Sequence, residues 1–324
     1  MTPRYFCTLF DSHYLLKGMA MLRSLARFCP GATVYVLCMD VQTQNILERL
    51  QLPFVQCIAL DDVEDDALLT AKASRGVAEY CWTLSSCFTW YVMQRYPQID
   101  LLTYVDADLL FFSDVQPLFD EIGPASIAII EHRFTPRLKE REVNGRFCVE
   151  WDSFRRDAQG LACLAQWRAQ CIEWCYYRLE DGKMGDQKYL DAWPSLYSAC
   201  HILMHAGAGI APWNYAQYRF GEDAHGHITV EGAPLIFYHF HQFQLLDNGK
   251  FDRLSTFYTA ECPEPAAVYE VYEATLQQCL TDVRALVPDF KAGLQAVSHV
   301  RRRRFVQELV PFWAKEIARR FLRY

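Results

Sequence analysis

The chain has 324 residues, 52% of them hydrophobic and 22% charged, which is enough for one large domain or two modest domains with a sizeable core. This composition excludes extensive disorder, and a formal net charge of −7 argues against a nucleic-acid-binding protein. The charge is unevenly distributed, because residues 301–324 contain eight Lys or Arg and two Asp or Glu. The sequence therefore predicts an acidic body followed by a basic tail.

Strands and helices are predicted to alternate along the first 131 residues. Five apolar runs predict strands, at residues 4–10, 32–40, 54–60, 101–105 and 126–131. Apolar residues at helical spacing predict three helices, at residues 18–28, 42–50 and 70–95. Strands that are near-continuous apolar runs are typical of an α/β fold with a mainly parallel, Rossmann-like sheet and helices on both faces. Further along, the sequence predicts a helix at 158–180, a strand at 234–243 and helices within 263–299.

The 13 cysteines, an odd number, include no CxxC pair, and Cys171 and Cys175 have no partner pair at zinc-like spacing. This pattern favours reduced, buried cysteines over a disulfide framework. The N-terminal segment lacks the apolar core of a secretory signal, and no stretch approaches the ~20 apolar residues of a membrane-spanning helix. We therefore expect a cytoplasmic protein, either soluble or peripheral on the inner face of the membrane.

Aspartates follow the first four predicted strands, at positions Asp11, Asp40, Asp61 and Asp106. In this class of fold, ligands bind beyond the carboxyl ends of the parallel strands. An acidic edge suits a cation or a hydroxyl-rich ligand better than a bare anion. Neither GxGxxG nor GxxxxGK[ST] follows the first strand, which argues against a dinucleotide dehydrogenase or a P-loop enzyme.

Asp106 and Asp108 lie one residue apart in YVDADLLFFSD, at the end of the predicted buried strand 101–105. As the chain turns, both carboxylates can point to one side and bind a hard divalent cation, Mn²⁺ or Mg²⁺, whose other positions are filled by phosphate oxygens and water. We expect their charge to be uncompensated until a cation and a diphosphate bind. The alternative is an Asx turn that closes the strand.

The segment LLTYVDADLLFFSDVQPLF (101–119) resembles the DxD segment of GT-A glycosyltransferases, most closely the glycogenin and lipopolysaccharide galactosyltransferase group. The opening segment CTLFDSHYLLKGMAMLRSL (7–25) is also similar, and the resemblance extends over roughly residues 4–243. It implies a GT-A-like fold and a nucleotide-diphosphate sugar donor, with a UDP-sugar favoured. It further implies that Thr8, Leu9, Asp11 and Tyr14 surround the base and ribose, with the Tyr14 ring stacked on the base; alternatively, Tyr14 is a core aromatic at a helix entry.

A basic residue ahead of the DxD strand reaches the donor in this family. Lys72 and Arg75 share a face of a predicted helix, and we assign the donor contact to Arg75. For Lys72 a solvated helix face is the preferred interpretation. The alternative for Arg75 is an ion pair with Glu79, four residues on.

The segment LIFYHFHQF (235–243) resembles the late His-aromatic-x-Gly motif of the family, which implies that His239 completes the metal site with Asp106 and Asp108. His241 would face the same side of the strand. The sequence departs from the motif, since Gln242 stands where a glycine is expected nearby and no KPW follows.

The segment GDQKYLD (185–191) matches the acidic–amide pair of the family, which implies that Asp186 binds sugar hydroxyls and that Gln187 lies beneath the anomeric carbon. The family leans to retention of configuration; in an inverting reaction Asp186 could act as the base. Asn144 and Gly145, in VNGRFCVEW (143–151), are implied to lie near the sugar. The alternatives are a helix cap at Asp186 and a plain Asn-Gly turn.

The predicted organisation is a glycosyltransferase domain over residues 1–255, with a nucleotide-binding part at 1–125 and an acceptor part at 126–255, followed by a helical region at 256–324. The tail from residue 301 combines basic residues with Phe and Trp at helical spacing. It is predicted either to bind an anionic membrane surface or to pack on the acidic body.

The leading interpretation is a metal-dependent glycosyltransferase that uses a glycan or lipid-linked saccharide as acceptor, in cell-envelope polysaccharide synthesis. One alternative is a nucleotidyltransferase, which would need the phosphate-binding segment that is missing after the first strand. The other is a non-catalytic nucleotide-sugar-binding protein on a transferase fold.

Within the acceptor part, Trp213 and Asn214 are candidates to shape the acceptor pocket, or are core residues.

Overall fold

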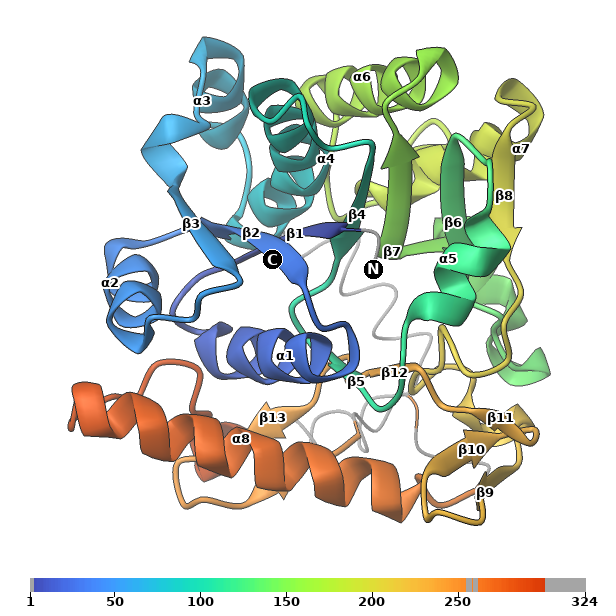
Figure 1. Cartoon of the computed structure of the whole chain (residues 1–324). Helices are drawn as coiled ribbons and strands as arrows, with labels where there is room; N and C mark the ends of the chain where they lie inside the picture. The colour runs from blue at the N-terminus through green and yellow to red at the C-terminus, as the bar shows by residue number, and fades with distance from the viewer. Residues whose placement is uncertain (1–2, 255–257, 259–261, 301–324) are drawn as a thin grey trace.

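The computed structural model describes residues 3–254, 258 and 262–300, and a seven-stranded sheet with the order β3-β2-β1-β4-β7-β6-β8 forms its centre (Figure 1). Its strands are β1 (Arg4–Phe10), β2 (Ala32–Cys38), β3 (Val55–Ala59), β4 (Leu101–Val105), β6 (Ile127–Glu131), β7 (Phe147–Arg155) and β8 (Cys200–Leu203). Strand β7 is antiparallel to β4 and β6, and the other neighbouring pairs are parallel. The predicted mainly parallel α/β sheet is confirmed.

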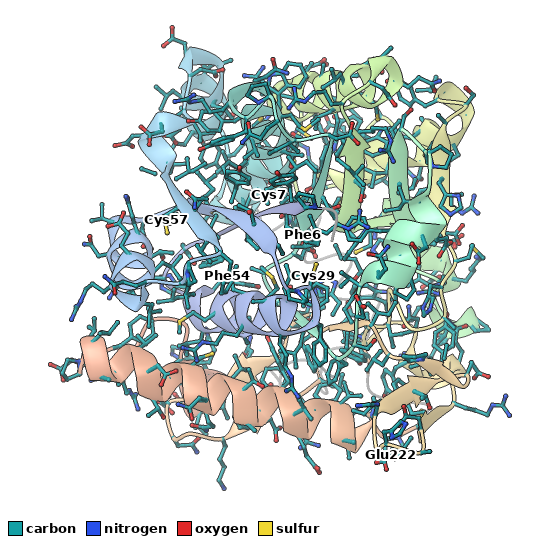
Figure 2. The ribbon with its side chains drawn as sticks, viewed as in Figure 1. Phe6, Cys7, Cys29, Phe54, Cys57 and Glu222 are labelled. Carbon is teal, nitrogen blue, oxygen red and sulfur yellow. The ribbon has the colours of Figure 1, made fainter. Side chains whose placement is uncertain are left out.

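Helices cover both faces of this sheet. Helices α4 (Val77–Arg95) and α6 (Ala158–Glu173) lie on one face, and α1 (Leu15–Phe28) lies on the other with α8 (Ala266–Leu286) running along its outer side (Figure 1). Phe6 and Cys7, consecutive residues of β1, belong to the two different apolar clusters: Phe6 to that of α1 and α8, and Cys7 to that of α4 and α6 (Figure 2). This alternation along a strand buried on both sides explains why the strands read as continuous apolar runs.

Several helices begin at aspartates that the sequence supplies at the right spacing. Asp40 accepts a hydrogen bond from the backbone N–H of Thr43 (2.7 Å) at the start of α2 (Val41–Leu50). Asp157 accepts one from Gly160 (2.9 Å) at the start of α6. Such caps satisfy the free amides of a helix start and hold the helices in place against the sheet.

Three predicted helices differ from those observed. The segment 70–95 covers the end of α3 (Asp66–Lys72) and all of α4, because Glu79 accepts a hydrogen bond from the N–H of Gly76 (2.8 Å) and caps a new start there. The helix predicted at 158–180 ends at Glu173. Helix α8 ends at Leu286, before Pro288, and residues 287–296 are turns and irregular structure apart from a bridge between Gln295 and Leu246.

The strand predicted at 234–243 is also shorter than expected. It contains β12 (Phe237–His239), which pairs antiparallel with β5 (Leu109–Phe111), with His239 opposite Leu109. Strands β5 and β12 lie side by side (Figure 1). Because β5 directly follows the DxD residues, this pairing carries His239 to them.

The remaining elements are short. They are η1 (Leu60–Asp62), α5 (Gln116–Ile122), η2 (Pro136–Asn144), η3 (Gln187–Ala192), α7 (Trp193–Leu196), η4 (Tyr215–Gln217), β9 (Phe220–Glu222), β10 (Ile228–Val230), β11 (Ala233–Pro234), β13 (Gln244–Leu245) and β14 (Phe251–Asp252). Among the described residues, no helix is both long and apolar enough to cross a bilayer. The predicted basic tail, 301–324, lies outside the described residues, and the domain division at 255/256 stays a prediction.

Candidate active site

The candidate site lies at the carboxyl ends of β1 and β4. These strands are neighbours, and the chain continues from β1 to β2 toward one edge of the sheet and from β4 to β6 toward the other edge, so their ends form the switch point at which α/β sheets bind ligands. Asp11 follows β1 and Asp106 follows β4, whereas Asp40 caps α2 and Asp61 lies in η1. Of the four aspartates predicted to form an acidic edge, Asp11 and Asp106 therefore lie at the site, and Asp40 and Asp61 do not.

His239 lies at the centre of the site, in contact with three carboxylates. Its Nε2 atom lies 3.0 Å from Oδ1 of Asp108 and 3.9 Å from Oδ2 of Asp106, and its Nδ1 atom lies 2.7 Å from Oε2 of Glu150. The structure thus brings together the three residues predicted to bind the metal. Their role as ligands stays a prediction.

Asp108 has charge partners in the absence of any metal. Besides His239, the ammonium group of Lys17 lies 3.6 Å from its Oδ2 atom. Burial acts to raise the pKa of Asp108, but the charge and hydrogen bond of His239 and the charge of Lys17 outweigh it and lower the pKa. The expectation that both carboxylates are uncompensated before a cation binds is therefore wrong for Asp108, because a helix residue, Lys17 of α1, reaches across to it.

Asp106 has a different environment. The phenol of Tyr104 donates a hydrogen bond to its Oδ1 atom (3.2 Å). Burial raises the pKa of Asp106 to about 7, and the charges of Asp108, Asp186 and Glu150 add to this rise while His239 opposes it. The site therefore holds one readily ionised carboxylate, Asp108, and one that a cation would help to ionise.

Of the residues that the structure describes, Asp106, Cys148 and His239 bring potential ligand atoms within 4.8 Å of one another. Carboxylate, thiolate and imidazole groups are all ligands of divalent transition metals. These three residues therefore fit a divalent cation, with Asp108 beside them on His239.

Two further carboxylates lie in the same buried region. Glu150 and Asp152, on β7, have no exposed surface, and Tyr104 of β4 is the register partner of Asp152. Within the described part of the chain, neither oxygen of Asp152 has a hydrogen-bond partner. Burial raises the pKa of Asp152 well above its usual range, and the charges of Asp186, Asp106 and Glu150 raise it further.

Asp186 and Gln187 are held by α4 and by the 144–145 loop. Ser85 of α4 donates a hydrogen bond to Oδ2 of Asp186 (2.7 Å), and burial raises the pKa of Asp186 to about 6 although that bond lowers it. The Gln187 side chain donates a hydrogen bond to the backbone carbonyl of Asn144 (3.0 Å). A Cβ atom on Gly145, whose φ is +140°, would lie 3.1 Å from Cγ of Gln187. Three of the four predicted sugar-binding residues, Asn144, Gly145 and Gln187, are thus in direct contact, and Asp186 adjoins them in the chain.

The N-terminal residues assigned to the nucleotide surround the end of β1. Thr8 is fully buried, and its hydroxyl has no partner in the part of the chain that the structure describes; Leu9 is buried beside it. Asp11 accepts hydrogen bonds from the backbone N–H groups of His13 (3.0 Å) and Tyr14 (3.1 Å) and so fixes the entry to α1. Tyr14 is 44% exposed, with the Lys17 ammonium 4.4 Å from its ring centroid, so it is not the core aromatic of the alternative interpretation.

Arg75 lies between α4 and the end of α6. Its guanidinium donates hydrogen bonds to the Thr83 hydroxyl and to the carbonyl of Ile172, and it does not adopt the alternative ion pair with Glu79, whose carboxylate bonds Gly76 and Tyr177. The donor contact of Arg75 stays a prediction and would require these bonds to change.

Lys72 pairs with Glu64 (2.6 Å) on the surface, in agreement with the preferred interpretation of a solvated helix face.

An aromatic group covers His239 on the side of the 211–214 loop. The Trp213 ring lies 5.1 Å from that of His239 and 5.6 Å from that of His241. Asn214 is fully buried and its amide bonds the backbone of His132 and residues 209 and 211, so it shapes the loop.

Lys17, Cys148, Glu150 and Asp152 were missed by the sequence reasoning. A signal was present for the last two, since two acids alternate within the apolar run FCVEWDSF, as expected for residues on one face of a buried strand. Lys17 and Cys148 gave no such signal.

No protein-family model matches this chain. It is 31% identical over 311 residues to the uncharacterized protein YfnD of Bacillus subtilis (strain 168), a match that covers 95% of this chain and 99% of YfnD. It is 29% identical over 297 residues to the uncharacterized protein YfnF of the same organism, covering 90% of this chain and 97% of YfnF.

Solved structures that share the fold include two glycosyltransferases. The glycosyltransferase GlyE of Streptococcus pneumoniae TIGR4 superimposes with a TM-score of 0.51 at 15% identity, covering 87% of this chain and 64% of GlyE, so the chain spans about two thirds of that protein. The galactosyltransferase LgtC, in complex with donor and acceptor sugar analogs, gives a TM-score of 0.50 at 12% identity, covering 85% of this chain and 95% of LgtC. The predicted GT-A fold is confirmed by these similarities.

Proposed function

The chain belongs to the same family as YfnD of Bacillus subtilis and has the GT-A fold, and from this premise we propose that it is a metal-dependent glycosyltransferase. It would move a sugar from a nucleotide-diphosphate sugar, with a UDP-sugar favoured, to a hydroxyl group of a saccharide or lipid-linked acceptor. The proposal rests on one observation above all. His239 is carried by β12 to within 3.0 Å of Asp108 and 3.9 Å of Asp106, at the carboxyl ends of the strands.

The residues that would hold the cation are Asp106, Asp108 and His239. When bound, a divalent cation there would neutralise the diphosphate and so favour its departure. Glu150 would hold the His239 ring in position through Nδ1. Lys17 supplies a second positive charge beside Asp108.

In the proposed reaction, the oxygen of the acceptor hydroxyl forms a bond to the anomeric carbon of the sugar. The bond from that carbon to the phosphate oxygen breaks, and the nucleoside diphosphate leaves with the electron pair. In the retaining course, which the fold resemblance favours, the hydroxyl proton passes to the departing phosphate oxygen. Gln187, fixed by its bond to the Asn144 carbonyl, would lie beneath the anomeric carbon, and Asp186, held by Ser85, would bind sugar hydroxyls.

The test is nucleotide release. The purified full-length chain is incubated with Mn²⁺ and a panel of UDP-, GDP-, CMP- and dTDP-sugars, with and without a metal chelator. Release from one donor that stops with the chelator, and in Asp106→Ala and Asp108→Ala, is the expected result. Asp114→Ala, six residues along and bonded to the backbone of Gln116, is the matched control and should retain activity.

Two outcomes would contradict the proposal. Release that continues in the chelator removes the metal from the mechanism. Thermal stabilisation by a nucleotide without turnover, for every acceptor tried, would favour the non-catalytic binding protein instead.

To reach a lipid-linked acceptor, we propose that the basic tail attaches the protein to an anionic bilayer. Sedimentation with vesicles of anionic and of neutral lipid, using the full chain and a chain lacking residues 301–324, tests this. Loss of anionic-vesicle binding on truncation supports the proposal, and equal binding by both chains contradicts it.

A further inference from the structure

We propose that Cys148 is a ligand of the metal in this site, so that the centre selects a metal that accepts sulfur, Zn²⁺ or Co²⁺, over Mg²⁺. The inference rests on the proposed metal-dependent function and concerns which cation serves it. It goes beyond the DxD residues and His239, which on their own offer oxygen and nitrogen ligands.

The geometry places the thiol at the site. The Sγ atom of Cys148, a carboxylate oxygen of Asp106 and a ring nitrogen of His239 all lie within 4.8 Å of one another. Zinc ligands lie about 2.0–2.3 Å from the ion, so small side-chain movements would allow these three atoms to share one. Cys148 is the only one of the 13 cysteines, all of them described, that belongs to such a group.

The backbone fixes the position of this thiol. Cys148 is 5% exposed on β7, where it pairs with Ile130 of β6, and Glu150, two residues on, accepts a hydrogen bond from the N–H of Asp106 through its carbonyl (3.3 Å). Strand β7 therefore fixes the position of the Cys148 thiol and, through this hydrogen bond, the position of the Asp106 backbone at the end of β4. A ligand on a rigid central strand is more precisely placed than one on a loop.

A second observation points to a metal at the same place. The Nδ1 atom of His239 lies 2.7 Å from Oε2 of the buried Glu150. A carboxylate bonded to the distal nitrogen of a histidine is the usual support of a metal-binding imidazole, because it fixes the ring orientation and the nitrogen that binds. The Nε2 atom then faces the aspartates.

The donor set decides the metal. One ligand each from Cys, His and Asp, with a further position open for substrate, matches the ligand types and the number of protein ligands of a catalytic zinc site. Thiolate ligands select softer ions, whereas Mg²⁺ requires oxygen ligands. Asp108, already paired with Lys17 and His239, would remain available to the same ion or to orient the groups around it.

X-ray absorption on the wild-type full chain tests the inference without any variant. The protein is loaded with one equivalent of Zn²⁺, and the zinc-edge fine structure is measured. We expect a sulfur shell at about 2.3 Å corresponding to one sulfur, with nitrogen or oxygen ligands at about 2.0–2.2 Å. A first shell without sulfur overturns the inference.

Variants then assign the sulfur. With Co²⁺, the wild type should show a near-ultraviolet thiolate-to-cobalt absorption band that Cys148→Ser lacks and Cys279→Ser retains. Cys279 is a matched control, because it is also buried and lies on α8, beside Arg23. We also expect Cys148→Ser to lower the affinity for Zn²⁺ relative to Mn²⁺ by at least about tenfold, the low end of what losing even an outer-sphere partner costs.

The outcomes separate this inference from the proposed function. Visible cobalt bands that Asp106→Ala abolishes but Cys148→Ser leaves unchanged, with no thiolate band, overturn the role of Cys148 and leave the metal site in place. A band that persists in Cys148→Ser assigns the sulfur to another cysteine and likewise overturns the inference. A wild-type chain that binds Zn²⁺ through one sulfur but releases no nucleotide from any donor supports the role of Cys148 and contradicts the proposed function.

Discussion

Glu150 and His239 form a hydrogen bond of 2.7 Å between Oε2 and Nδ1, at a place where Glu150 has no exposed surface and His239 is 4% exposed. In this interior a carboxylate is costly unless it is paired, and His239 is its partner. The other oxygen, Oε1, has no partner among the described residues. The pair joins β7 of the central sheet to β12 of the small sheet and sets which nitrogen of His239 faces Asp106 and Asp108.

Replacing Glu150 with glutamine should weaken metal binding. Glu150→Gln keeps the shape of the side chain but removes the charge that fixes the imidazole, and outer-sphere changes of this kind cost about 10–100-fold in metal affinity. Titration calorimetry with Mn²⁺ in the presence of UDP measures the effect. Glu273→Gln, which removes an equivalent charge from the ion pair between Glu273 of α8 and Arg253, should leave the affinity unchanged. Equal affinities for the wild type and Glu150→Gln would show that the bond is structural.

Removing the charge of Lys17 should tighten metal binding to the free protein. Lys17 lies 3.6 Å from Asp108 and competes with a cation for it. Two unit charges about 4 Å apart interact by roughly 1 kcal/mol in water and more in a partly buried site, so Lys17→Met should raise the Mn²⁺ affinity about fivefold or more. The same competition predicts that wild-type protein binds Mn²⁺ weakly alone and tightly with a nucleotide-sugar.

Equilibrium dialysis without nucleotide measures this effect. Lys72→Met is the control, because Lys72 pairs with Glu64 on the surface and should not change the affinity. A weaker affinity in Lys17→Met would mean that Lys17 supports the site instead of competing for it.

The fold was largely predictable because its strands are apolar runs between clear breaks. The five predicted strands match β1, β2, β3, β4 and β6 to within two residues at each end. The sequence could not predict β5, whose three residues lie inside the apolar run that follows Asp108, or its pairing with β12. That pairing joins segments more than 120 residues apart, and no local periodicity encodes such a contact.

The site residues that belong to a sequence motif could be predicted. Those that reach the site only through tertiary contacts could not. Asp106 and Asp108 were predicted from their position at the end of a buried strand and His239 from the family resemblance, and the structure brings the three together. Lys17 lies on a helix whose sequence gives no sign that its ammonium reaches Asp108, and Cys148 is one buried cysteine among many. Their roles depend on which strand lies next to which, and that order appears only in the folded sheet.

Adding a methyl group at Gly145 should impair turnover through Gln187. In Gly145→Ala, the new Cβ would lie 3.1 Å from Cγ and 3.3 Å from Nε2 of Gln187, and φ is +140°, where side chains are strained. We expect a fall in kcat of about tenfold or more, since small misplacements of positioning groups reduce turnover strongly. Gly226→Ala is the control. Its backbone is similarly strained, with φ +79°, but the new Cβ atom would have no other atom within 4 Å, so this variant measures the effect of backbone strain without crowding. Equal activity in the two variants would remove Gln187 from the positioning of the sugar.

The buried carboxyl group of Asp152 should make the folded protein less stable as the pH rises. Burial, followed by the charges of Asp186, Asp106 and Glu150, raises its pKa well above the usual range, so the folded protein holds this proton more tightly than the unfolded chain does. Its contribution to the free energy of unfolding is therefore full below the ordinary pKa of about 3.9 and decreases by about 1.4 kcal/mol per pH unit above it, until the folded-state pKa is reached. Asp152→Asn removes this titration, so the variant should be more stable than the wild type at pH 7, and the advantage should shrink toward pH 4.

Urea unfolding of both chains between pH 4 and pH 8 measures the difference, from which the titrating groups that do not interact with Asp152 cancel. Asp223→Asn is a control of opposite sign, because hydrogen bonds from His227 lower the pKa of Asp223 to about 2. Its stabilising effect is present above the ordinary pKa and is lost as the pH falls toward 2, so Asp223→Asn should be the less stable chain at pH 7 and should approach the wild type in acid. If Asp152→Asn is instead destabilised at pH 7, the carboxylate is ionised and paired in the folded protein, and the region around β7 must contain a cation or a hydrogen-bond donor that satisfies it.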